Sequence, residues 1–185
     1  MSAGKAAPLP PSMTVPTRIG DPAEIDYAKT TADFGPLARD RVPVRAMQES
    51  DLPAIVAIDR RITGGERFAY FKAKLAEALF ESDIRLSLVA ERDERPVGFI
   101  MARVDFGEFG CFEPVAVMDT IGVDPDYRQQ GVGRALLSQL LVNLNTLRIE
   151  RVRTEVDWRE RELLTFLDQK GFVPAQELCF SRIIA

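Results

Sequence analysis

The sequence has no histidine among its 185 residues, and this absence excludes several kinds of chemistry. Ser-His-Asp catalysis, Cys-His catalysis and His-ligated zinc all require the missing side chain, which is also the one best suited to move protons near neutral pH. Proton transfer must therefore use carboxylates, tyrosine, cysteine, lysine or water, and we expect no metal.

Cysteines and long apolar segments are also scarce. The two cysteines, Cys111 and Cys179, form neither a CxxC pair nor a zinc-ligand cluster. This is typical of a reduced cytosolic protein, although one disulfide is compatible with the sequence. No apolar run approaches the ~18 residues of a transmembrane helix, and the N-terminal residues lack the apolar stretch of a secretory signal. We therefore expect a cytoplasmic protein that does not bind membranes.

The sequence also lacks an excess of positively charged residues. There are 24 Lys and Arg residues against 28 Asp and Glu residues, which gives a formal net charge of −4. A chain with this balance has no overall field that attracts nucleic acid. We therefore expect no nucleic-acid partner.

Prolines are concentrated near the N-terminus, where seven of the 12 lie within the first 43 residues. Proline fixes φ and removes a backbone donor, and no apolar period persists there. We therefore expect an extended or disordered tail over Met1–Asp40 and one domain over residues 41–185. The tail is either a solubilising segment or a segment that binds a partner or covers the site.

From Val42 onward, apolar residues recur with the periods of strands and helices. The mixture predicts an α/β (α+β) fold with antiparallel hairpins and a parallel crossover. The expected strands are Val42–Arg45, Leu86–Arg92, Pro96–Asp105, Val115–Val123, Arg151–Trp158 and Leu178–Ile184, and the expected helices are Glu49–Arg61, Glu66–Glu81, Tyr127–Leu147 and Glu160–Lys170.

The most informative segment is a glycine-bearing loop between a strand and an apolar helix. The strand stops at Asp124-Pro125, and Gly131 and Gly133 let an anion approach the backbone closely. Unpaired amides and the positive end of the helix dipole point out of such a loop, and Arg128 and Arg134 add positive charge. These features predict a phosphate or pyrophosphate site. The alternative is that the glycines only ease a tight turn.

The loop does not match the common nucleotide-binding motifs. No Lys-Ser or Lys-Thr follows it, as a Walker loop requires, and Leu136 stands where the dinucleotide fingerprint needs a third glycine.

The segment Arg128-Gln129-Gln130-Gly131-Val132-Gly133 resembles the [QR]xxGx[GA] loop of the GNAT superfamily of acyl-CoA-dependent N-acetyltransferases. Lys170-Gly171-Phe172 is similar to the family's terminal turn, and the order of elements over residues 42–185 is similar too. The resemblance implies a mixed, mostly antiparallel sheet with a central, splayed parallel strand pair flanked by helices. It also implies acetyl-CoA as cosubstrate. The residues implied in acetyl-CoA binding are Ile121, Gly122, Val123, Arg128, Gln129, Gln130, Gly131, Val132, Gly133, Arg134 and Ala135.

Acetyl transfer to an amine needs a base, and Glu155 is the first candidate. Glu155-Val156-Asp157 resembles the Glu-Val-Arg start of a segment in ribosomal-alanine-type N-acetyltransferases, where the glutamate acts as base. Asp157 departs from that pattern. The alternative is that Glu155 lies on a solvated strand face, because Val152, Thr154, Val156 and Trp158 form the apolar alternation.

Asp119 is the second candidate base, because it interrupts an apolar alternation. It has the same parity as Val115, Val117, Ile121 and Val123, so a regular strand places it on an otherwise apolar face. Such a carboxylate either has a catalytic task or lies at a gap between strands. The alternative is a carboxylate that is hydrogen-bonded at a sheet edge.

The general acid is the point at which the sequence departs from the family. Leu167 occupies the position, four residues before the glycine of the terminal Gly-Phe, where the family often has tyrosine. Tyr70, Tyr127, Cys179 or water are the remaining proton donors for the thiolate.

The sequence thus predicts an N-acetyltransferase that transfers the acetyl group of acetyl-CoA to a primary amine by direct attack in a ternary complex. A protein lysine or N-terminus is slightly favoured as acceptor over a small-molecule amine. The alternatives are a non-catalytic acyl-CoA-binding module for sensing or docking, and a phosphate-binding loop unrelated to CoA. We expect a monomer or a homodimer.

Overall fold

The structure is a computed structural model, and it describes residues 42–81, 84, 86–106, 113–175 and 182–183. The expected tail Met1–Asp40 and most of the expected last strand Leu178–Ile184 lie outside the described residues.

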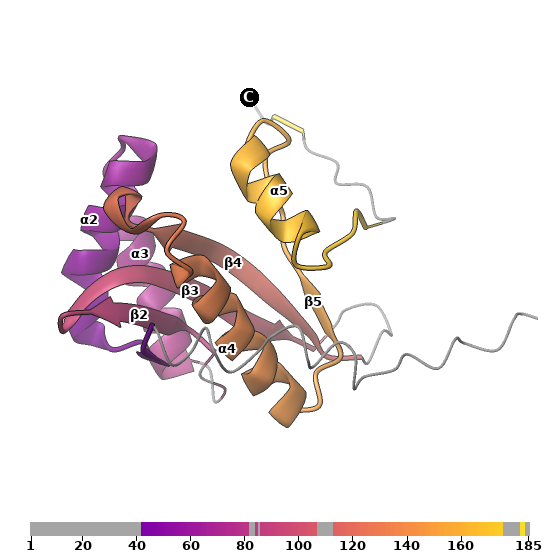
Figure 1. The fold of residues 1–185 in the computed structure, drawn as a ribbon. Coiled ribbons are helices and arrows are strands. Elements are labelled where there is room, and N and C mark those ends of the chain that lie inside the picture. Colours follow the sequence, from indigo (N-terminus) through magenta and orange to yellow (C-terminus); the bar gives the residue numbers. More distant parts are fainter. Residues whose placement is uncertain (1–41, 82–83, 85, 107–112, 176–181, 184–185) are drawn as a thin grey trace, which may run out of the picture. The chain divides into compact units, whose positions relative to one another are not determined.

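A five-stranded sheet forms the centre of the domain, with the strands in sequence order (Figure 1). The strands are β1 (Val44–Ala46), β2 (Leu88–Arg92), β3 (Arg95–Asp105), β4 (Val115–Val123) and β5 (Arg151–Arg153). Neighbouring strands from β1 to β4 are antiparallel, whereas β4 and β5 are parallel. This arrangement confirms the predicted α/β class with one parallel pair.

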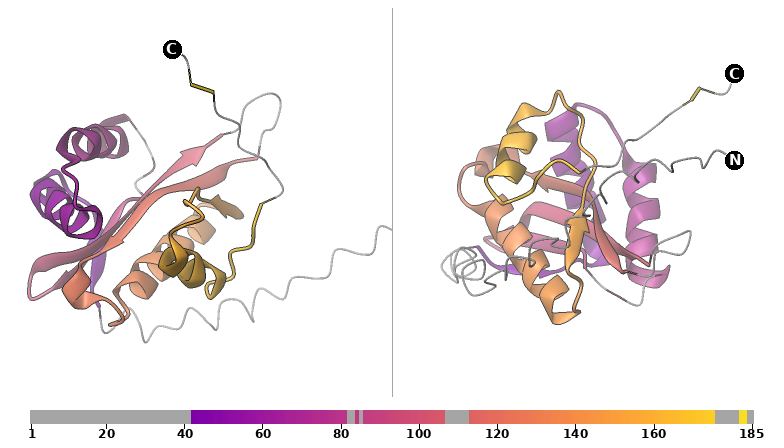
Figure 2. Two further views of the ribbon diagram at one scale, coloured as in Figure 1. Left: turned by 90° about the horizontal axis from the view of Figure 1, so that it is seen from above. Right: turned by 90° about the vertical axis from the view of Figure 1, so that its right-hand side faces the viewer.

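Helices cover both faces of the sheet. The helices are α2 (Leu52–Thr63), α3 (Phe68–Ala76), α4 (Val132–Thr146) and α5 (Arg161–Asp168), with short 3-10 turns at Glu49–Asp51 and Pro125–Tyr127 and a π-helical turn at Glu77–Glu81. Figure 2 shows α2 and α3 on one face and α4 and α5 on the other. None of the helices in the described part of the chain is long and apolar enough to cross a membrane.

Alternating residues of the central strands form a core on each face of the sheet. Phe99 and Met101 pack with side chains of α2 and α3. Ile100 and Ala102 pack with α4 instead, where the buried leucines of that helix include Leu136. The alternation from Phe99 to Ala102 therefore directs side chains toward α2 and α3 on one face of the sheet and toward α4 on the other.

The helix expected from Tyr127 begins five residues later, at Val132. Pro125–Tyr127 forms a separate 3-10 turn, and Arg128 that follows is extended (φ −63°, ψ 153°). Gln129 and Gly131 then have positive φ values of 60° and 84°, which no α-helix can contain. Arg128–Gly131 is therefore a loop, and the helix begins only where the apolar period begins, at Val132.

The hairpin between β2 and β3 is closed by a tight two-residue turn. Arg92 pairs with Arg95, and the two residues between them, Asp93 and Glu94, have φ values of 48° and 60°. Two positive φ values in succession are typical of a type I′ turn, whose twist matches that of the strands. Neither residue is glycine, so the turn carries backbone strain.

Glycine at the second position of this turn should stabilise the protein. Glu94→Gly is expected to raise the free energy of unfolding by about 0.5–1 kcal/mol, because the relieved strain exceeds the backbone entropy that glycine gains in the unfolded chain. Urea unfolding measures the change. Glu94→Ala keeps a Cβ in the same conformation and is the control, which should show no gain. A Glu94→Gly variant no more stable than Glu94→Ala would contradict the assignment.

Candidate active site

The loop before α4 has a backbone conformation that is suited to an anion. Gly131 is the N-cap of α4, and as a glycine it provides no side chain to cap this end of the helix. A Cβ placed on Gly131 would meet no atom of the described residues within 4 Å, so these residues leave the space in front of the loop open. Left-handed residues at Gln129 and Gly131 alternate with other conformations, as in the concave backbone sites that bind anions.

The N-terminal end of α4 presents backbone donors to this space. Its first helical hydrogen bond runs from the Ala135 amide to the Gly131 carbonyl. The amides that precede it, among them those of Val132 and Gly133, therefore point out of the helix end. Together with the helix dipole they favour a phosphate group. The residues present thus fit the pyrophosphate of acetyl-CoA.

Ion pairs from helix α2 hold the turn that precedes the loop. Arg61 Nη1 lies 2.5 Å from Asp124 Oδ1, and Arg61 Nη2 lies 2.9 Å from Asp126 Oδ2. The Asp124 carboxylate also accepts a hydrogen bond from the Asp126 amide, and Gln130 donates to the Asp126 carbonyl. The loop conformation is therefore fixed by contacts within the protein.

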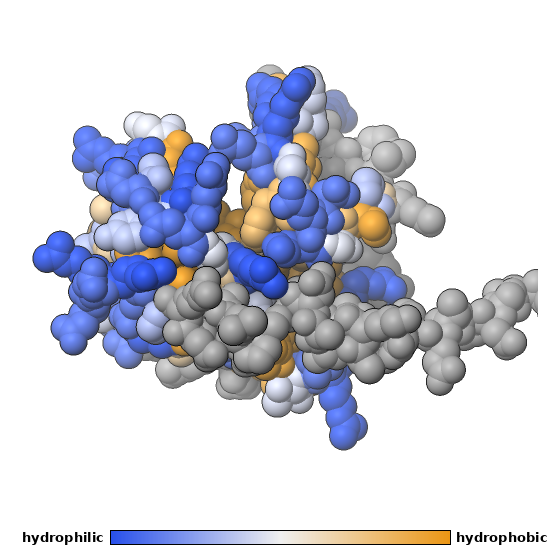
Figure 3. Space-filling view, viewed as in Figure 1, coloured by the Kyte–Doolittle hydropathy of each residue, from blue (hydrophilic) through white to orange (hydrophobic). Residues whose placement is uncertain are grey.

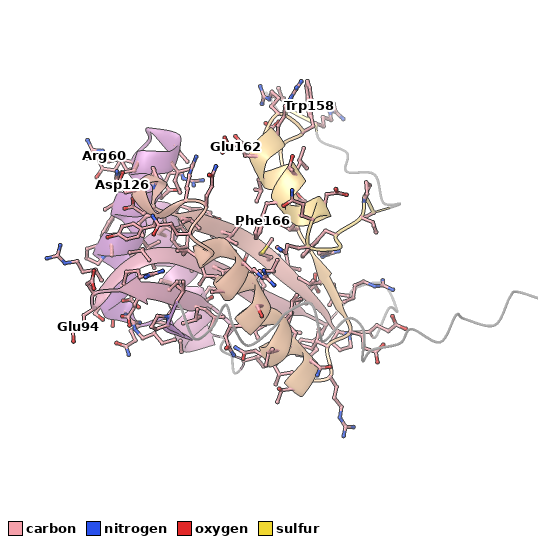
Figure 4. All side chains as sticks on the ribbon, in the orientation of Figure 1. Arg60, Glu94, Asp126, Trp158, Glu162 and Phe166 are labelled. Carbon is pink, nitrogen blue, oxygen red and sulfur yellow. The ribbon has the colours of Figure 1, made fainter. Side chains whose placement is uncertain are left out.

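A pocket of about 600 Å³ lies between this loop and α5. It is lined by Arg128, Gln129, Arg161, Glu162, Thr165, Phe166 and Gln169. Phe166 extends from α5 toward the start of α4 (Figure 4), and a Cβ placed on Gly133 would lie 3.6 Å from its ring. Apolar side chains are visible between α5 and the polar surface over the end of α2 (Figure 3). The pocket thus combines charged residues with an apolar wall.

The parallel strands β4 and β5 stay paired only briefly. Their pairing runs from Val115 with Arg151 to Val117 with Arg153, and the Thr154 hydroxyl then donates to the Met118 carbonyl. Beyond this point the chain turns away from β4 toward α5 (Figure 1). In the described part of the protein, the edge of β4 beyond Met118 therefore has no partner strand on this side.

Glu155 lies just beyond the point of divergence, on the opposite side of the gap from β4. The expected strand Arg151–Trp158 is regular only over Arg151–Arg153, although the burial alternation continues to Val156. Glu155 is exposed, and its side chain makes no hydrogen bond or ion pair with the described residues. Trp158 does not continue the apolar face, because it is 78% exposed (Figure 4).

Asp119 occupies a β-bulge that the sequence pattern does not reveal. Met118 pairs with Ala102 and Thr120 pairs with Met101, so Asp119 is an extra residue without a partner on β3. A bulge of this kind reverses the alternation of the strand beyond it.

The expectation that Asp119 shares a face with Ile121 and Val123 is therefore wrong. Ile121 and Val123 pack in the core on the α4 face. Asp119 instead turns toward α3, where Oδ1 accepts a hydrogen bond from Arg103 and Oδ2 lies 3.5 Å from Lys74 Nζ. The carboxylate lies among charged groups rather than on an apolar face.

Lys74 and Arg103 belong to a charged cluster that the sequence analysis missed. Lys74 also pairs with Glu77, at 3.0 Å, and all four side chains line a second pocket of about 480 Å³. The hydrogen bond to Asp119 raises the pKa of Arg103 above its usual range. Burial lowers the pKa of Lys74. The hydrogen bond to Glu77 and the charge of Asp119 raise it by more, so the pKa lies above its usual range.

The position of the expected general acid is part of the core. Leu167 is buried and packs in the cluster on the α4 face, as the half-buried Tyr127 does. Tyr70 is on α3, where its ring contacts Phe71 and the Arg67 guanidinium. Cys179 lies outside the described residues. No tyrosine lies at the position that is usual for the family.

A sequence model of the Acetyltransferase (GNAT) family matches residues 52–166, more than half of the chain. The chain is 26% identical over 129 residues to the [ribosomal protein bS18]-alanine N-acetyltransferase of Escherichia coli strain K12. This match covers 70% of the chain and 79% of that protein. It is also 29% identical over 87 residues to the mycothiol acetyltransferase of Propionibacterium freudenreichii. This match covers 42% of the chain but spans only 28% of the relative.

Among solved structures, the fold is similar to that of the aminoglycoside N-acetyltransferase AAC(6')-Iy in complex with CoA. The TM-score is 0.66, at 19% identity, over 78% of this chain and 95% of that one. This likeness concerns the fold alone, whereas the family model matches the sequence itself. The chain therefore belongs to the GNAT family of acetyl-CoA-dependent N-acetyltransferases.

Proposed function

We propose that this protein transfers the acetyl group of acetyl-CoA to a primary amine by direct attack in a ternary complex. The observation that carries the proposal is the uncapped N-terminus of α4, which opens from a loop of left-handed residues beside the unpaired edge of β4. An anion site next to free strand edges suits a ligand that has a pyrophosphate and an amide-bearing arm.

The binding roles follow from these positions. The backbone of Gln129, Gln130, Gly131, Val132, Gly133, Arg134 and Ala135 would hold the pyrophosphate, with Arg128 beside it. The backbone of Ile121, Gly122 and Val123 would pair with the amides of the pantetheine arm, as a further strand pairs with a sheet edge. When bound, acetyl-CoA supplies an acetyl group activated as a thioester.

The protein's own contribution to the chemistry is positioning and one base. Holding the amine next to the thioester supplies much of the rate, so a single weak base suffices. Glu155 would take the proton from the ammonium, since its carboxylate is exposed beside the gap between β4 and β5. Asp119 is the second candidate, but its oxygens already face Arg103 and Lys74. Water would return a proton to the leaving thiolate.

A protein amine, either an N-terminus or a lysine, is slightly favoured as acceptor. The relative from Escherichia coli acts on an alanine of ribosomal protein bS18, and Glu155-Val156-Asp157 resembles the segment that carries the base in such enzymes. A small-molecule amine is the close alternative.

A second candidate function is a non-catalytic module that binds acyl-CoA for sensing or docking. The observation that favours it is that Leu167, which is buried, occupies the position where the family often has a tyrosine that acts as general acid. Turnover of acetyl-CoA with a broad panel of amines distinguishes the two. Tight CoA binding without turnover of any amine would select the module.

Charge reversal at the start of α4 tests the anion site. Gly133→Asp is expected to raise the Kd for acetyl-CoA by about tenfold or more, because the carboxylate repels the pyrophosphate. It should not lower the Tm, since aspartate in the first turn favours a helix and a Cβ at this position meets neighbours only at 3.6 Å. Calorimetric titration and thermal unfolding measure the two effects. Gly133→Ala is the control, and unchanged affinity in Gly133→Asp would argue against the anion site.

Removal of the proposed base tests the chemistry. Glu155→Gln is expected to lower kcat at neutral pH by about 10²–10⁴-fold, because the amide cannot accept the proton. The Kd for acetyl-CoA should not change. Glu150→Gln, an exposed glutamate shortly before it, is the matched control. If Glu155→Gln keeps the wild-type kcat and pH–rate profile, the base is Asp119 or solvent.

A further inference from the structure

The pocket of about 480 Å³ on the α3 face has a composition that limits what the acceptor can be. Among its lining residues are Lys74, Glu77, Met101, Arg103, Phe106 and Asp119. A pocket of this volume accommodates a small molecule or one amino-acid unit.

Two irregular elements meet at this pocket. Helix α3 ends in a π-helical turn that begins with Glu77, and β4 bulges at Asp119. The carboxylate of Glu77, three residues after Lys74 on the same helix, and that of Asp119 lie 3.0 Å and 3.5 Å from the ammonium of Lys74. Single π-helical turns and bulges cost stability and are frequent at functional sites. Two such elements beside one charged cluster favour a binding role for this pocket.

The pocket lies close to the gap between β4 and β5. Asp119 comes directly after Met118, whose carbonyl accepts the last hydrogen bond that crosses to the segment after β5. The anion site lies at the start of α4, which covers the other face of the sheet. The acceptor would therefore approach the thioester from the α3 face, through this pocket.

The charges of the cluster balance, since two cations face two carboxylates. Such a lining does not suit a polycation, because Lys74 and Arg103 repel additional positive charges. It suits a zwitterion, whose ammonium faces the carboxylates and whose carboxylate faces the cations. Both cations are charged at neutral pH, because the ordinary pKa values of lysine and arginine lie far above 7 and the neighbouring carboxylates raise them further.

The two cations have donors to spare for a ligand. Among the described residues, the Arg103 guanidinium donates only through Nη1, to Asp119, and the Lys74 ammonium hydrogen-bonds to Glu77. A guanidinium and an ammonium each have more N–H groups than these bonds use. Phe106, which is 66% exposed, adds an apolar wall for the stem of an acceptor.

We propose that the acceptor carries a carboxylate close to its primary amine, and that Lys74 and Arg103 bind this carboxylate. The proposal rests on the acetyl transfer to an amine proposed above. The carboxylate has two possible sources, which are the α-carboxylate of a free amino acid and the acidic side chain that follows a peptide N-terminus.

Acceptors that differ in one group test the proposal. The full chain, with acetyl-CoA, is assayed with free amino acids and with their amides, and with peptides Ala-Glu-Ala-amide and Ala-Gln-Ala-amide. In at least one pair, we expect kcat/KM to be at least about tenfold higher for the acid than for its amide. The amide lacks the charge-assisted contact, and the loss of such a contact typically has an effect of this size. The pair that shows the difference identifies the source of the carboxylate. Equal rates within every pair, or faster amides, would overturn the proposal.

A variant of Lys74 tests whether the pocket is responsible. Lys74→Met keeps the aliphatic stem and is expected to raise KM for the preferred acid about tenfold, with little change for its amide. Lys72→Met, an exposed lysine on the same helix, is the matched control. If both variants retain the preference for the acid, the pocket does not bind the carboxylate.

Calorimetric titration with acetyl-CoA separates this proposal from the proposed function. Lys74→Met should bind acetyl-CoA as the wild type does. If the wild-type protein binds acetyl-CoA and acetylates amines without preferring acids, the carboxylate proposal alone fails. If it binds no acetyl-CoA, the proposed function fails with it.

Discussion

The candidate site depends on the early end of the pairing between β4 and β5. Three residue pairs join these strands, and beyond them the two strands separate. The rest of β4 remains stable because its other edge is paired with β3 up to Val123. Divergence inside a sheet leaves backbone donors and acceptors exposed next to a well-packed core. The loop before α4 leads to one face of the sheet, and the charged cluster beside α3 lies on the other face.

Local irregularity is concentrated around the same region. Gln129 has a positive φ without being glycine, Asp119 occupies a bulge, and Glu77 begins a π-helical turn. Each of these features is less stable than a regular element and persists because the surrounding packing and ion pairs hold it. By contrast, α4 and the segment of β3 from Phe99 to Ala102 follow the regular periods. The domain thus combines a regular frame with an irregular centre, as binding sites commonly do.

Features with a local cause could be predicted from the sequence, and those with a distant cause could not. The glycines of the loop, the hairpin turn and the apolar faces of the helices depend on neighbouring residues, and the sheet class followed from them. The bulge at Asp119 depends on register with β3, which a strict period of two cannot represent. The ion pair of Lys74 with Asp119 joins a charged residue of a helix to a strand residue 45 positions later in the chain, so no spacing pattern in the sequence predicts this pair.

The ion pairs of Arg61 have a consequence for the thermodynamics of binding. They connect α2, on one face of the sheet, to the turn before α4, on the other. Because these contacts order the loop during folding, a ligand that binds there does not have to immobilise it, and the corresponding loss of conformational entropy is not subtracted from the affinity. The same ion pairs are exposed to solvent, so this preorganisation weakens as ionic strength rises.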